Sequence, residues 1–199
     1  MARIIDYDVV ARTLASAGMV CKYYRSGAFG FPDDRPVVYR GWIGPADASI
    51  RPAMLVMTRS VAEPYEGNLA ALLVRAWTES LPKLWGEPPR LWIMPASHWA
   101  FELDANRVWL RGLLADVQID ATELESRTDG SAIEFGASES APAGRFVCGL
   151  LRNLTASDFF LAFGGHDVVC MVHHHKQLWW STTEGQTIES LDRLIAGGD

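Results

Sequence analysis

One stretch of the chain decides the fold: residues 167–181, DVVCMVHHHKQLWWS. The residues before and after the three histidines are rich in β-branched and aromatic side chains, which favour strands. We predict strands over 167–173 and 178–181, joined by a turn about Lys176-Gln177 into an antiparallel hairpin. If that turn has an even number of residues, Leu178 and Trp180 share the face of His173. A hairpin here argues against a sheet built of steadily alternating strands and helices.

Away from this hairpin, two periodicities divide the chain into helices and strands. Apolar residues recur at helical spacing in 66–81, which Pro82 ends, and in 144–153. Thr187 is a plausible N-cap for a last helix. Weaker patterns predict helices over 7–17 and 107–117 and a short one after Asp120, whose spacing to Glu123 suits a capping box.

Short runs of β-branched and aromatic residues predict the other strands at 37–43, 53–58, 91–94, 132–135 and 159–163. We expect 37–58 to form a second antiparallel pair, whereas 26–34 is rich in turn residues and is expected to be a loop. These elements indicate an α+β fold with a mixed, largely antiparallel sheet and helices packed mainly on one side. The 199 residues suit one domain over 1–199, with a division into two lobes near 119–143 left open.

Charge and hydropathy exclude two classes of partner. The net charge is −6 and the basic residues are scattered singly, so we expect no nucleic-acid binding. The longest apolar runs, such as 159–163, are far shorter than the ~18 residues of a membrane span, so we expect no membrane association. Asp6 and Asp8 lie where a signal peptide needs its apolar region, and we expect a cytoplasmic location.

Three cysteines lie far apart at Cys21, Cys148 and Cys170. Their odd number and wide spacing resemble neither a disulfide framework nor a Cys-x-x-Cys metal site. Cys170 lies within an apolar strand, where a thiol acts as a small buried side chain. The cysteines therefore indicate no catalytic or metal role.

The histidine run is the most conspicuous chemical feature of the sequence. Side chains alternate along a strand, so His173 and His175 are expected on one face and His174 on the other. Two imidazoles at this spacing can ligate zinc or another divalent transition metal, with His166 or His98 completing the set. The alternative is that the histidines stack on the neighbouring tryptophans and bond the backbone, with no cofactor at all.

Aromatic residues gather in a second place, at Tyr23, Tyr24, Phe29 and Phe31. They either pack into the core or present an exposed patch to a protein partner.

Two hypotheses about function follow. The first is a noncatalytic protein-interaction module, which is not an enzyme, with self-association into a homo-oligomer left open. The second is a metal-binding domain or metal-dependent hydrolase that uses His173 and His175.

Overall fold

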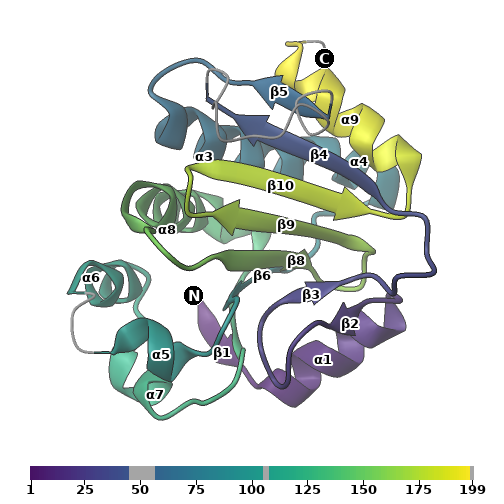
Figure 1. Ribbon diagram of the computed structural model, residues 1–199. Coiled ribbons are helices and arrows are strands. Elements are labelled where there is room, and N and C mark those ends of the chain that lie inside the picture. The colour runs from purple at the N-terminus through teal and green to yellow at the C-terminus, as the bar shows by residue number, and fades with distance from the viewer. Residues whose placement is uncertain (45–56, 105–107, 198–199) are drawn as a thin grey trace.

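The computed structural model describes residues 1–44, 57–104 and 108–197. Its centre is one eight-stranded sheet with the strand order β1-β7-β6-β8-β9-β10-β4-β5 (Figure 1). The strands are β1 (Arg3–Ile5), β4 (Val38–Ile43), β5 (Thr58–Ser60), β6 (Leu91–Pro95), β7 (Ala132–Phe135), β8 (Phe159–Phe163), β9 (Val168–His173) and β10 (Gln177–Thr182). A separate two-stranded sheet pairs β2 (Val20–Cys21) with β3 (Phe29–Gly30).

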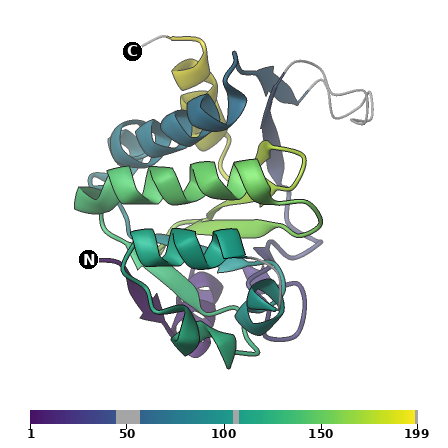
Figure 2. The same ribbon diagram turned by 90° about the vertical axis from the view of Figure 1, so that its left-hand side faces the viewer.

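Most of the helices pack on one face of the large sheet. They are α3 (Tyr65–Arg75), the π-helical turn η1 (Ala76–Ser80), α4 (Pro82–Trp85), α5 (Trp99–Leu103), α6 (Val108–Asp116), α7 (Ala121–Glu125), α8 (Ser140–Asn153) and α9 (Gly185–Ile195), with the 3₁₀ turn η2 (Ala137–Glu139) before α8. Figure 2 shows this face, on which α8 lies between α3 and α6. The other face is packed by α1 (Tyr7–Ser16) and the β2–β3 hairpin. The α+β class, the mixed sheet and the mainly one-sided helices are thus confirmed.

Strand alternation and helix periodicity together build the main core. Val168, Cys170 and Val172 of β9 point to the helix face and are fully buried. The apolar stripe of α8, which includes Phe146 and Leu150, packs over them. Burying this much aliphatic and aromatic surface is the main force that holds helices and sheet together.

Several boundaries differ from the sequence predictions. Residues 37–58 do not form an antiparallel pair, because β4 and β5 run parallel, with Gly41 opposite Thr58. Much of the strand predicted at 53–58 lies outside the described residues. Pro82 does not end the helical path but begins α4, since proline is tolerated at the first position of a helix. Thr187 lies buried inside α9 rather than at its N-cap.

Two further segments extend what the sequence indicated. The 26–34 segment, expected as a loop, contributes the short strand β3. Residues 119–143, where a division between lobes was left open, contribute α7 and β7, and β7 pairs with both β1 and β6 in the large sheet. Within the described residues, no helix combines the length and the apolar character needed to cross a membrane.

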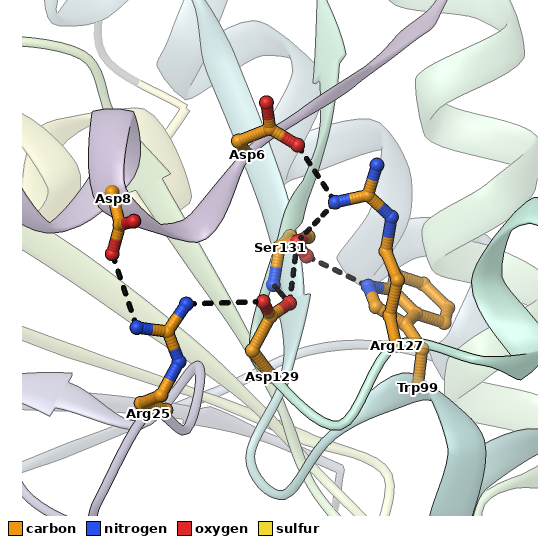
Figure 3. Close-up of polar contacts among 7 residues, drawn as sticks. All are labelled: Asp6, Asp8, Arg25, Trp99, Arg127, Asp129 and Ser131. Carbon is orange, nitrogen blue, oxygen red and sulfur yellow. Dashed lines mark hydrogen bonds and ion pairs between the residues drawn. The ribbon is translucent and has the colours of Figure 1, made fainter.

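A polar network fastens the small layer, α1 and the β2–β3 hairpin, to the large sheet (Figure 3). Arg25, between β2 and β3, pairs with Asp8 of α1 at 3.2 Å and with Asp129 at 3.4 Å. Arg127 pairs with Asp6 at 2.7 Å and donates a hydrogen bond to the Ser131 hydroxyl at 3.0 Å. These contacts join the small layer to residues 127–131, which lead into β7.

The backbones also meet at this junction. The Gly130 N–H donates to the carbonyl of Arg25 at 2.8 Å. A Cβ added at Gly130 would lie only 2.0 Å from the backbone nitrogen of Gly27, so residue 130 has no room for a side chain. This contact sets where the hairpin stands beside the sheet.

Candidate functional site

A groove of about 790 Å³ lies between the β2–β3 hairpin and the part of the sheet that the small layer leaves uncovered. Figure 1 looks onto this face, where β9, β10 and β4 have no described helix in front of them. The floor is formed by side chains from neighbouring strands, among them Phe160 of β8, Met171 of β9, Trp179 of β10 and Tyr39 of β4. Phe29 and Phe31 form the wall on the hairpin side.

The register of the β9–β10 hairpin decides which side chains reach this floor. His173 pairs with Gln177 and Met171 with Trp179, so these four side chains share the groove face. Trp180 pairs with Cys170 and is buried on the helix face. The even-numbered turn considered from the sequence is therefore not formed.

Three residues, 174–176, make the turn instead. The N–H of Lys176 bonds the carbonyl of His173 at 3.0 Å, and Lys176 adopts a left-handed φ of 60°. A three-residue loop with its last residue left-handed is a common hairpin connection. One residue more or less would exchange the faces of every side chain on β10.

Trp179 is the largest side chain of the floor and its position is fixed. Its indole Nε1 donates to Oε1 of Gln177 at 2.9 Å. Its ring lies across Gly41 of β4, where an added Cβ would come within 2.7 Å of Cζ3. The absence of a side chain at Gly41 makes room for the indole.

Basic side chains stand around the aromatic floor. Lys22 donates from Nζ to the Phe31 carbonyl at 2.6 Å and pairs with Asp33 at 3.3 Å. Arg35 also lines the groove and, within the described part of the chain, forms no ion pair with a carboxylate. His173 and His175 line the same groove. Its rim is therefore more basic than the protein as a whole, which carries a net charge of −6.

The three consecutive histidines come together at the β9–β10 turn, and two of them, His173 and His175, also line the groove. Their ring centroids are 4.2 to 4.9 Å apart, and one nitrogen from each ring can be chosen such that all three lie within 4.8 Å of one another. His174 was expected on the opposite face from His173 and His175. It joins them because the strand ends at His173 and the turn breaks the alternation.

The other two predicted ligands lie elsewhere and have contacts of their own. His98 is the N-cap of α5, where its Nδ1 accepts a hydrogen bond from the Phe101 N–H at 3.1 Å. His166 stacks on Trp85 with ring centroids 3.8 Å apart, and burial lowers its pKa below the ordinary value. Because His166 precedes β9 and His173 ends it, the two stand at opposite ends of that strand. Neither joins the three-histidine cluster in the described residues.

The four aromatic residues proposed for partner binding differ in their burial and in whether they line the groove. Phe29 and Phe31 are buried, and Phe29 packs near Tyr7 of α1 with ring centroids 6.2 Å apart. Tyr23 is 70% exposed yet lines the groove, whereas Tyr24 is 94% exposed and does not. The groove thus brings together part of the aromatic set and part of the histidine set.

Most of the floor was not found by sequence reasoning. Trp179, Met171 and Tyr39 carry no motif, and their common face depends on the hairpin turn and on the pairing of β10 with β4. One signal was available. Val169 and Met171 belong to the unbroken apolar run 168–172, which predicts apolar side chains on both faces of the strand.

Comparisons with known proteins add no relationship: no protein-family model matches the chain, and neither the curated protein sequences nor the solved structures contain a significant match.

Proposed function

We propose that the protein is a noncatalytic protein-interaction module whose groove holds a short apolar segment of a partner protein. The observation that supports this most directly is the groove itself, an aromatic surface of the sheet that no described helix covers. Trp, Tyr and Met are enriched at protein interfaces, and Trp and Tyr dominate their energetic centres. Trp179, Tyr39 and Met171 supply all three types on one floor.

The charge of the rim suggests the composition of that segment. Lys22 is already paired with Asp33, whereas Arg35 has no carboxylate partner within the described part of the chain. A partner segment with an acidic residue next to its apolar side chains would place that acid near Arg35. Such complementarity favours specific and fast association.

The volume limits how much of the partner enters. Pockets of ~300–1,000 Å³ enclose ligands of the size of a drug molecule, and a cavity of about 790 Å³ falls within that range. We therefore infer a few side chains of an extended peptide as the occupant, rather than a whole helix. The three free cysteines suit a reducing compartment, and the proposal places the protein in the cytoplasm.

The arrangement of hydroxyl and imidazole groups supports a binding role over a hydrolytic one. Ser181 and His173 both line the groove, but Ser181 pairs with Val169, four residues along β9 from His173. At ~3.3 Å per residue the two stand roughly 13 Å apart along the sheet. A serine nucleophile needs its base within hydrogen-bond distance, about 3 Å.

A display experiment tests the proposal. The probe is a random peptide library selected on the untagged full chain, and the selected peptides are then measured against the native chain and a Trp179→Ala variant. We expect peptides that combine aromatic or aliphatic residues with Asp or Glu. Their affinity should fall at least about tenfold with Trp179→Ala, since the loss of a hot-spot side chain costs more than ~1.4 kcal/mol.

A matched pair of variants provides the control. Tyr23→Ala removes a groove side chain and should weaken the same peptides, whereas Tyr24→Ala removes its exposed neighbour and should not. Peptides that bind the Trp179→Ala variant as well as the native chain would overturn the proposal. So would a library that yields no binding peptide at all.

A further inference from the structure

We propose that the β9–β10 turn is a binding site for one divalent transition-metal ion, held by His173, His174 and His175. This inference is independent of the groove's proposed partner. It starts from the shape of the turn, which ends the strand at His173 and closes with left-handed Lys176. Three imidazoles that an extended strand would send to alternate faces are thereby gathered around one point.

The spacing of the donor atoms suits a metal ion. One nitrogen from each ring lies within 4.8 Å of the other two. Zinc binds imidazole nitrogen at ~2.0–2.1 Å, so two nitrogens on one ion are separated by roughly 3.4 Å in a tetrahedral site. Small rotations of these partly exposed side chains close the difference.

A carboxylate already orients the middle ring. Asp158 lies 2.8 Å from Nδ1 of His174 and also accepts the backbone N–H of His174 at 3.0 Å. When Nδ1–H donates to Asp158, Nε2 carries the lone pair that a metal needs. A carboxylate behind a ligating histidine is the usual outer partner in metal sites, where it fixes the tautomer and raises the basicity of the ligand.

One nitrogen of the first ring already has a contact. Nδ1 of His173 accepts the backbone N–H of His175 at 3.2 Å, so that nitrogen is unprotonated. Coordination through Nδ1 would replace this hydrogen bond. We therefore expect moderate affinity, in the micromolar range, rather than the very tight binding of a structural zinc site that folds a domain.

The charges around the turn also permit a cation. Lys176 is bound to Glu66 of α3 at 2.6 Å, so its positive charge is compensated. Arg152 acts on the same Glu66 carboxylate, and Asp158 contributes a negative charge next to the rings. Imidazole ligands favour zinc, copper and nickel over magnesium and calcium, whose preferred ligands are oxygens.

Zinc titration of the untagged full chain, by calorimetry and by competition with a chromophoric chelator, tests the site. We expect one zinc per chain with a micromolar dissociation constant. His174→Ala should weaken binding at least tenfold. Asp158→Asn should weaken it ~10–100-fold, the range for loss of an outer carboxylate partner. His166→Ala removes a histidine outside the cluster and should change nothing.

The outcomes separate this site from the groove. His174 does not line the groove, so His174→Ala should keep peptide binding, while Trp179→Ala should keep zinc binding. Circular dichroism of each variant checks that it is folded. No zinc binding by the native chain would overturn the proposal. Equal losses from His174→Ala and His166→Ala would overturn it as well, because they would indicate general surface binding.

Discussion

Replacing Gly130 by alanine should loosen the small layer that forms one wall of the groove. The new Cβ would lie 2.0 Å from the nitrogen of Gly27 and 2.4 Å from the carbonyl carbon of Ser26. These are backbone atoms, so relief requires the two segments to separate by more than about 1 Å, given ordinary contacts of ~3.5–4.0 Å. That movement also stretches the 2.8 Å hydrogen bond from Gly130 to Arg25.

The magnitude follows from these two losses. Overpacking a close contact costs about 1–3 kcal/mol, and one weakened hydrogen bond adds roughly 0.5–1.5 kcal/mol. We expect the free energy of unfolding to fall by about 3 kcal/mol. For a chain of this length the melting temperature should fall by roughly 6–12 °C.

Urea denaturation and calorimetry measure the change, and Gly112→Ala is the matched control. Gly112 is an exposed residue inside α6 with no atom within 4 Å of an added Cβ, so alanine there should stabilise the protein by ~0.5–1 kcal/mol. The two substitutions are chemically identical and should have opposite signs. A loss below about 0.5 kcal/mol for Gly130→Ala would refute the close backbone contact.

Two further predictions concern titrating groups. Complete burial raises the pKa of the Cys170 thiol. Iodoacetamide at pH 8 should therefore label the partly exposed Cys21 and Cys148 first and reach Cys170 only after unfolding. Equally fast labelling of Cys170 would contradict its burial. The hydrogen bond from Lys176 lowers the pKa of Glu66 below its ordinary value of 4.5. This contribution to stability is present above about pH 4.5 and lost as the pH falls through the lower folded pKa. We compare the unfolding free energy of the native chain with that of Lys176→Ala. The difference should be under ~1 kcal/mol at pH 7 and should vanish in acid. A difference that grows in acid would show that the Lys176–Glu66 pair affects stability with the opposite pH dependence.

Local patterns were sufficient to predict most of the elements. The stripe in 144–153 and the capping residue Asp120 lie in α8 and at the start of α7, where Asp120 accepts the Thr122 N–H at 2.9 Å. The stripe depends on residues three or four apart and the observed cap on residues two apart, whereas the side-chain bond of Asp120 goes to Thr122 and not to Glu123 as a capping box requires. Such short-range patterns can be recognised in a sequence. The α+β class followed from the same local signals.

Long-range pairing could not be predicted in the same way. Nothing local distinguishes a parallel from an antiparallel partner for β4, because residues 44–57 separate it from β5 in the chain. The two-residue strand β3 also has too few residues for an alternating pattern. It is identified by its pairing with β2 and its packing against α1.

The turn between β9 and β10 links the fold to both proposals. Because it has three residues, Trp179 faces the groove while Trp180 is buried against Cys170 on the helix face. The two adjacent tryptophans are chemically the same, so only the register assigns one to the core and the other to the groove floor. The same three-residue turn takes His174 out of strand alternation and brings its ring to those of its neighbours. A two-residue turn would have placed Trp180 on the open face and kept the histidines apart, and the length of this turn therefore decides whether the chain has either site.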